Sequence, residues 1–364
     1  MNGKPREGLA LVDHAINNGG MDVVTAPSLP SPLHADTGAP RRSLRVALVQ
    51  MRWLPDPDEH LAQLADGIAT AAAHGATAVF LPELTLRRYP GDTPASGTPK
   101  DLAESLQDGP TIAFARAQAI EHGVFVHASL YERPDDDDQP DDPRGYNTAV
   151  LVAPDGTLVG RTRKTHIPIS AGYHEDTYFR PGTDDDAFPV YEPAGLGARL
   201  GLPTCWDEWF PEVARSYGLA GSEVLVYPTA IGSEPTFPDF DTAPIWQRVI
   251  VANGITAGQF MVVPNRWGDE GDITFYGSSF ISDPFGRVLV AAPRDADAVL
   301  VADLDLAART EWLRLFPFYV TRRPDLYGTL VAPVDEERHA YGARDAIDAA
   351  IAVAATPTGR EVRA

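Results

Sequence analysis

Between residue 44 and about residue 330, short apolar runs alternate with segments whose apolar residues recur at helical spacing. The run 44–50, Leu-Arg-Val-Ala-Leu-Val-Gln, is typical of a strand, and residues 59–74 carry leucine and alanine at the spacing of a helix. A second buried strand is predicted at 76–81, and the same alternation continues along the chain. Because strands and helices alternate throughout, the sequence predicts one α/β-type domain rather than two separate domains.

Both ends of the chain lack this alternation. Residues 1–43 are rich in glycine, proline and serine and show no sustained period, so we expect a flexible N-terminal arm. Residues 331–364 are charged and alanine-rich, and two interpretations remain open for this tail: a helix docked at a subunit interface, or disorder. The predicted organisation is therefore an arm at 1–43, a domain at 44–330 and a tail at 331–364.

Composition excludes several classes of function. A net charge of −21 over 364 residues would repel a phosphate backbone, so we expect no nucleic-acid partner. No apolar run approaches the length that crosses a bilayer, and we expect no membrane association. The nine histidines lack metal-binding spacing, so no metal and no cofactor are expected. One cysteine forbids an internal disulfide, which fits a reducing cytoplasm.

The single cysteine, Cys205, lies between a strand-like run at 198–203 and a helix-like run that starts near Pro211. A thiol at a helix start lies among unpaired backbone N–H groups and near the positive end of the helix dipole, and both favour the thiolate. A lone cysteine is nevertheless more often a small buried hydrophobe. Its position alone therefore does not make Cys205 a nucleophile.

Two further polar residues follow strands. Glu83 comes directly after the strand predicted at 76–81, at the end where α/β proteins place ligand-binding groups. Lys164 follows the strand predicted at 158–163. Taken singly, a glutamate or lysine in such a place is commonly solvated.

Together, three stretches resemble the nitrilase superfamily of carbon–nitrogen hydrolases: Leu81-Pro-Glu83-Leu, Gly160-Arg-Thr-Arg-Lys164-Thr-His-Ile-Pro168 and Cys205-Trp-Asp-Glu-Trp-Phe-Pro-Glu212. The resemblance implies that Glu83 is the general base, Lys164 the oxyanion stabiliser and Cys205 the nucleophile. Glu175 matches a second glutamate that orients this triad. The implied fold is of the α+β class, a four-layer α-β-β-α sandwich, and the implied assembly is a homodimer or a larger homo-oligomer.

Further runs at 227–235, 275–280 and 322–327 resemble the branch that hydrolyses N-carbamoylputrescine. That branch implies conversion to putrescine, ammonia and carbon dioxide through a cysteine thioester. It carries glutamine where this chain has Glu208, and the loop after residue 235 also diverges. The residues expected to bind this N-carbamoyl amine substrate are Trp206, Asp207, Glu208, Trp209 and Glu234, since acidic side chains attract an ammonium.

Other functions remain open. The substrate could instead be N-carbamoyl-β-alanine, as in a β-ureidopropionase, or an ω-amide. A carboxylate-bearing substrate calls for an arginine in the pocket, and Arg180, Arg266 or Arg322 could supply one. From a different class, a catalytically silent scaffold should lack a member of the triad, and none is missing. A redox-sensing thiol protein should carry a resolving cysteine, which is absent.

Overall fold

The computed structural model describes residues 13–15, 21–27, 29–33, 41–135, 141–170, 172–183 and 187–333. Among these residues, eight strands form one twisted sheet in the order β1-β2-β16-β3-β4-β5-β6-β7. Its strands are β1 (Asp13–Ala15), β2 (Asp22–Thr25), β3 (Ser43–Gln50), β4 (Ala78–Phe80), β5 (Phe125–Glu132), β6 (Tyr146–Val152), β7 (Leu158–Arg163) and β16 (Ala298–Asp305).

A second sheet has the order β15-β14-β11-β10-β9-β8. It consists of β8 (Val190–Tyr191), β9 (Leu200–Gly201), β10 (Val224–Val226), β11 (Phe260–Val263), β14 (Phe280–Ser282) and β15 (Val288–Ala291). A separate hairpin joins β12 (Trp267–Glu270) to β13 (Ile273–Tyr276).

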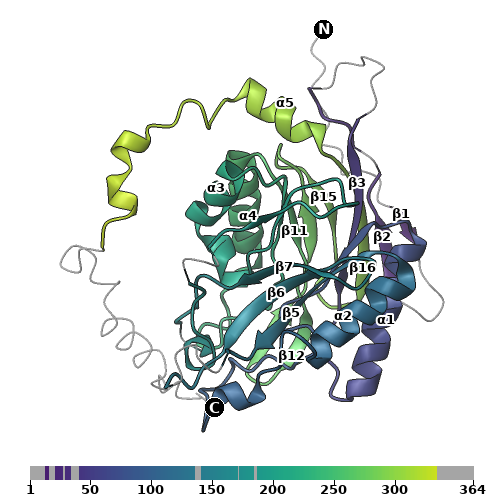
Figure 1. The fold of residues 1–364 in the computed structure, drawn as a ribbon, viewed down its shortest axis with the longest axis vertical. Coiled ribbons are helices and arrows are strands. Elements are labelled where there is room, and N and C mark those ends of the chain that lie inside the picture. Colours follow the sequence, from purple (N-terminus) through teal and green to yellow (C-terminus); the bar gives the residue numbers. More distant parts are fainter. Residues whose placement is uncertain are drawn as a thin grey trace, which may run out of the picture.

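Helices cover the outer face of each sheet (Figure 1). Helices α1 (Pro57–Ala73) and α2 (Pro110–His122) pack on the eight-stranded sheet, and α3 (Pro211–Leu219) and α4 (Ala243–Ala257) pack on the six-stranded sheet. The core between the sheets joins residues of both, such as Leu48 and Val226. The predicted four-layer α-β-β-α sandwich is therefore confirmed.

The remaining helical segments are short. Helix α5 (Ala307–Leu315) follows β16 and contacts α4, where the indole of Trp312 donates to the carbonyl of Ile255. In Figure 1 the chain after α5 extends away from the two sheets. The 3₁₀ helices are η1 (Pro99–Leu102), η2 (Glu175–Thr177), η4 (Cys205–Trp209), η5 (Pro324–Leu326) and η6 (Gly328–Leu330). No helix in the described part of the chain is both long and apolar enough to cross a membrane.

Three local predictions need correction. The expected arm contains β2, which pairs in parallel with β16 and buries Val23 and Val24, although a four-residue strand shows no readable period. The sequence at 103–122 predicts a helix that is interrupted at Gly109-Pro110. In the structure the helix starts only at Pro110, and Glu104, which precedes it, accepts the N–H of Thr111 in its first turn. The sequence predicts a loop at 265–275, but the structure forms the β12–β13 hairpin there. Residues 334–364 of the tail lie outside the described residues.

Candidate active site

Topology brings the three candidate side chains to one edge of the sandwich. Glu83 follows β4, and β5 runs parallel to β4. Because β6 is antiparallel to β5 and β7 is antiparallel to β6, the start of β6 and the end of β7 lie at the same edge as Glu83. That edge therefore carries Asn147 near the start of β6 and Lys164 just after β7. The second sheet contributes Cys205, which comes four residues after β9.

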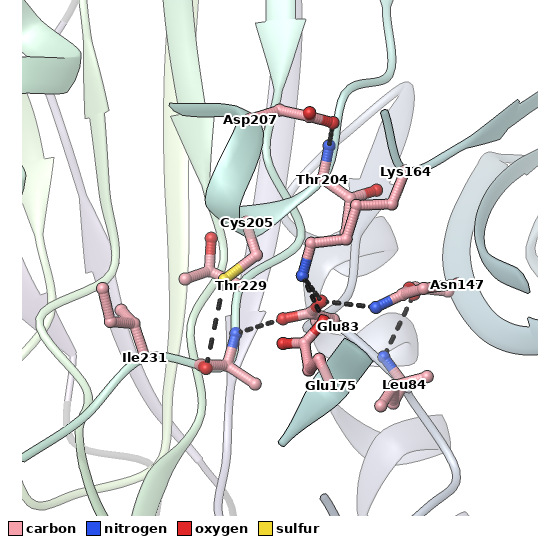
Figure 2. Close-up of polar contacts among 12 residues, drawn as sticks. Glu83, Leu84, Asn147, Lys164, Glu175, Thr204, Cys205, Asp207, Thr229 and Ile231 are labelled. Atoms are coloured by element: carbon pink, nitrogen blue, oxygen red, sulfur yellow. Dashed lines mark hydrogen bonds and ion pairs between the residues drawn. The ribbon is translucent and has the colours of Figure 1, made fainter. Parts of the chain in front are cut away.

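Glu83, Lys164 and Glu175 form a buried network (Figure 2). The Lys164 ammonium donates to Glu83 Oε1 at 2.9 Å and to Glu175 Oε2 at 2.7 Å. The other oxygen of Glu175 accepts the hydroxyl of Tyr89 at 2.8 Å. Although burial opposes charge on the ammonium, the carboxylates of Glu175 and Glu83 hold the pKa of Lys164 well above its usual value. The lysine is thus a fixed positive charge.

Glu83 is held on all sides. Its Oε1 also accepts from the Asn147 amide at 2.6 Å, and its Oε2 accepts the N–H of Ala230 at 2.8 Å. Leu84 has a left-handed φ of 48°, which turns the chain sharply after Glu83. The buried Arg266 donates to the carbonyl oxygens of both residues, at 2.5 Å for Glu83 and 3.2 Å for Leu84. The carboxylate therefore has little freedom to rotate away from Lys164.

Cys205 opens η4 in a left-handed conformation, with φ of 38°. Its N–H donates to the carbonyl of Pro228 at 3.0 Å, and its sulfur lies 4.0 Å from the carbonyl oxygen of Ala230. In Figure 2 the thiol points toward the same space as the ends of Glu83 and Lys164. A strained backbone at a nucleophile turn can direct the reactive side chain toward the substrate.

The sequence-based expectation that the thiolate is favoured is wrong for the free protein. Burial, followed by the charge of Glu83, raises the pKa of Cys205 well above the usual thiol value, and Lys164 only partly opposes this. A neutral thiol beside a fixed carboxylate is suited to giving up its proton during attack rather than before it. The geometry thus fits general-base activation by Glu83.

Asp207 does not line the substrate cavity, which corrects the prediction for this residue. Its carboxylate accepts the N–H of Thr204 at 3.1 Å and the N–H of His166 at 2.9 Å, and it also contacts the His166 ring at 2.7 Å. A further contact reaches the N–H of Thr165 at 3.3 Å. Asp207 therefore connects the cysteine turn to the residues that follow Lys164.

Glu208 is also turned away from the cavity, contrary to the prediction. It is fully buried, and its Oε1 accepts the indole N–H of Trp246 in α4 at 2.6 Å. Its own carbonyl accepts from Asn253 in the same helix at 2.9 Å. Burial raises the pKa of Glu208 well above its usual value. This side chain contacts the protein interior, so it cannot touch a substrate.

A cavity of about 100 Å³ opens beside the thiol. Trp206, Trp209 and Glu234 line it, as the sequence predicted, together with Cys205 and Glu175. Sequence reasoning did not assign the other lining residues to the pocket, although three of them lie in the stretches 160–168 and 227–235: Pro168, Ser170, Tyr173, Ala230 and Ile231. Glu234 is the carboxylate of this lining that is not tied to Lys164, and burial raises its pKa.

No arginine, lysine or histidine belongs to the cavity lining within the described residues. Of the arginines considered from the sequence, Arg266 is paired with Glu270 at 2.8 Å. Arg180 lies with its guanidinium 4.4 Å from the centre of the Tyr146 ring, and Arg322 lies over Tyr327 in the segment after α5. None of the three lines the cavity.

Asn147 and Tyr89 are the positioning residues that the sequence analysis missed. Asn147 had a weak signal, since it is an amide residue near the start of a largely apolar strand. Tyr89 had none, because its hydroxyl reaches Glu175 across 86 positions of sequence. Among the described residues, no three His, Cys, Asp or Glu side chains are grouped so as to hold a metal ion.

Comparison with known proteins shows the family of the chain. The family model described as carbon-nitrogen hydrolase matches residues 45–314. The chain is 35% identical to a citrullinase of Francisella tularensis, over 79% of this chain and 98% of that protein. It is 34% identical to an N-carbamoylputrescine amidase of Arabidopsis thaliana, over 81% of this chain and 98% of that protein. A crystal structure of a carbon-nitrogen hydrolase from Helicobacter pylori G27 superposes with a TM-score of 0.71 at 30% identity, covering 80% of this chain and 99% of that one.

The fold and the family match define the class of the protein as a nitrilase-superfamily enzyme. The chain belongs to the carbon–nitrogen hydrolase family, and it is an amidohydrolase that acts on carbon–nitrogen bonds other than peptide bonds.

Proposed function

We propose that this enzyme hydrolyses the ureido group of N-carbamoylputrescine, giving putrescine, ammonia and carbon dioxide. The observation that carries the proposal is the set of side chains that line the cavity. Aromatic side chains and one independent carboxylate line it beside the thiol, and its lining holds no cation for a substrate carboxylate. This combination suits a substrate with a neutral ureido end and a positively charged distal end.

In the proposed chemistry, the Cys205 sulfur attacks the ureido carbon while Glu83 takes the thiol proton. The oxyanion that develops is stabilised by the Lys164 ammonium and by the N–H of Trp206, which lies in the first turn of η4 and so has no helical acceptor. Protonated Glu83 gives its proton to the terminal nitrogen, and ammonia leaves. The carbon remains bound to sulfur as a thioester that keeps the substituted nitrogen.

The second half of the reaction removes this acyl group. Water attacks the same carbon while Glu83 takes one of its protons, and the carbon–sulfur bond breaks with return of a proton to the thiolate. The product is a carbamic acid, which loses carbon dioxide to leave the free amine. Glu175 and Tyr89 hold Lys164 in place, and the proposed steps require no cofactor.

A ureido amino acid such as citrulline is a second candidate, and one observation favours it. The indole nitrogen of Trp209, a cavity residue, is buried and has no hydrogen-bond partner among the described residues. An indole N–H only donates, so a substrate carboxylate would give it an acceptor that an alkylammonium lacks. The citrullinase of Francisella tularensis is among the relatives of this chain.

Ammonia release from a panel of ureido compounds tests the proposal. We expect kcat/KM for N-carbamoylputrescine to exceed that for N-carbamoyl-β-alanine by at least about tenfold, since a carboxylate facing Glu234 is repelled. Glu234→Gln should lose part of this preference, mainly through a higher KM for the cationic substrate. Equal or faster turnover of N-carbamoyl-β-alanine would remove the proposal, and a maximum at citrulline would select the second candidate.

A matched control for Glu234→Gln is Asp241→Asn, seven positions nearer α4 on the same loop. Asp241 is exposed and paired with Arg294 at 2.9 Å, so its charge lies outside the cavity lining. We expect this substitution to leave the ratio of the two kcat/KM values within about twofold, because an exposed charge outside the cavity lining is screened by solvent and salt. A similar change in both variants would mean that Glu234 acts only through net charge.

We also propose a homodimer or larger homo-oligomer. The segment from the end of α5 to residue 333 extends away from the sheets in Figure 1. It exposes six large apolar side chains, those of Leu315, Phe316, Val320, Leu326, Leu330 and Val331. Exposed apolar surface of this extent favours a protein contact. Light scattering should give at least twice the chain mass of 39.2 kDa. Val320→Asp with Leu330→Asp should reduce that mass, whereas a monomeric wild type would contradict the proposal.

A further inference from the structure

Glu208 occupies an unusual place for a carboxyl group. It is fully buried, and no arginine, lysine or histidine of the described residues forms an ion pair with it. It lies in the same 3₁₀ turn as Cys205 and contacts two other elements, α4 through Trp246 and the chain after β10 through Thr229. A buried carboxylate without a cation is costly, whereas the neutral acid needs only hydrogen bonds.

The hydrogen bonds around Glu208 indicate where its proton lies. Its Oε1 accepts the Trp246 indole N–H at 2.6 Å, and its Oε2 lies 3.4 Å from the hydroxyl oxygen of Thr229. That hydroxyl has one hydrogen, and the carbonyl of Tyr227 is a much closer acceptor for it, at 2.8 Å. The Thr229 oxygen is then left as an acceptor facing Glu208, and a carboxylic acid O–H is the donor that satisfies it.

Other charged and titratable groups near Glu208 do not favour its ionisation. The thiol of Cys205, on the same turn, is neutral. Across the site, the charge of Glu83 disfavours a second negative charge on Glu208, and the positive charge of Lys164 offsets this effect only in part. The neighbouring strands contribute the phenol groups of Tyr227 and Tyr276, whose pKa values are raised well above their usual value by burial, and these phenols stay neutral.

We propose that Glu208 is a positioning residue that works as a neutral carboxylic acid, locking the cysteine turn against α4 and against the chain that presents Ala230. The proposal rests on Cys205 being the nucleophile. Thr229 immediately precedes Ala230, whose N–H holds Glu83 and whose carbonyl lies beside the cysteine sulfur. The short bond from Trp246 and the longer contact with Thr229 thus connect the turn that carries the thiol to the chain that holds the base. A shift of about 1 Å at such a site can cost on the order of 100-fold in rate.

Two variants separate this role from a merely structural one. Glu208→Gln keeps the pattern of one acceptor toward Trp246 and one donor toward Thr229, and it cannot ionise. Glu208→Met has similar length and no hydrogen bond. The rate at which iodoacetamide labels Cys205 reports the thiol–base geometry without any substrate, so it does not depend on which substrate is correct. We expect the Gln variant to match the wild-type rate within about threefold and the Met variant to be slower by at least about tenfold.

Thermal unfolding against pH provides the second measurement. A carboxyl group that is neutral in the fold but has its ordinary pKa in the unfolded chain makes the unfolded state bind fewer protons, so stability is lost as pH rises above about 4.3. Glu208→Gln lacks this loss, so its melting temperature should gain on the wild type steadily from pH 5 toward pH 9. This comparison needs neither the Met variant nor an active enzyme.

Parallel melting curves for wild type and Glu208→Gln would mean that Glu208 is ionised in the fold and would overturn the proposal. Labelling of Cys205 in Glu208→Gln as slow as in Glu208→Met would overturn it too, because the amide would then fail to replace the acid. If the labelling results hold but none of the ureido substrates is turned over, the proposed function fails and the positioning role of Glu208 stands.

Discussion

Replacing Cys205 by alanine will lower kcat by on the order of 10⁶-fold, the size of loss seen when a nucleophile is removed from a covalent mechanism. The fold should survive. The sulfur makes only a weak contact, 4.0 Å from the carbonyl oxygen of Ala230, and alanine removes only one buried atom. The measurement is ammonia release from N-carbamoylputrescine, with circular dichroism to check the fold.

Cys205→Ser is the matched control. The hydroxyl fits the space of the thiol, but its pKa is much higher, so a carboxylate base removes its proton poorly and activity should stay close to that of the alanine variant. Because Cys205 is the only cysteine in the sequence, one equivalent of iodoacetamide should inactivate the wild type and label this residue alone. Full activity in the alanine variant, or inactivation without labelling, would exclude Cys205 as nucleophile.

Sequence reasoning located the residues at strand ends correctly because backbone topology places them. Glu83 and Lys164 follow β4 and β7, and the parallel and antiparallel pairing of β4 to β7 brings these two strand ends to one edge. No spacing rule predicts the contacts that then hold the carboxylate. Asn147 and Ala230 reach Glu83 from 64 and 147 positions away, so only the folded chain shows them.

The same reasoning failed for side-chain direction beside Cys205. The sequence analysis treated residues next to the cysteine as pocket residues. A 3₁₀ helix has about three residues per turn, so residues three apart share a side. Trp206 and Trp209 therefore share the cavity side, while Asp207 and Glu208 contact His166 and Trp246 instead. Cys205, three residues before Glu208, also lines the cavity, because its left-handed φ of 38° takes it out of the helical pattern. The turn type, which the sequence did not indicate, decides which of the four can meet a substrate.

The thiol illustrates a second limit. A helix start, which the sequence shows, and a nearby lysine, which the family resemblance implies, both favour a thiolate. It does not show burial, which outweighs them and raises the pKa of Cys205. The electrostatic character of a site depends on the balance between desolvation and charge, and that balance is set by packing between the two sheets.

Lys164→Met is the second substitution from which we expect a large loss. Removal of one oxyanion donor costs about 10²–10³ in turnover. The substitution also leaves Glu83 and Glu175 facing each other in the interior without a cation, since both now contact the ammonium, at 2.9 Å and 2.7 Å. Breaking a buried ion pair in this way costs about 3–5 kcal/mol of stability. Both losses should be measurable, as kcat and as the free energy of unfolding.

A double variant distinguishes the two effects. In Lys164→Met with Glu175→Gln, one of the opposed carboxylates becomes neutral, so part of the lost stability should return. Activity should not return, because the oxyanion donor is still missing.

The Lys164→Met variant should also be less destabilised at low pH. Burial raises the pKa of Glu175 even beside Lys164, and without the lysine a proton on one carboxyl group relieves the repulsion between Glu83 and Glu175. Its deficit relative to the wild type should therefore grow as pH rises. A fall in kcat of less than about tenfold in Lys164→Met, with the expected loss of stability, would leave Lys164 as a structural charge only.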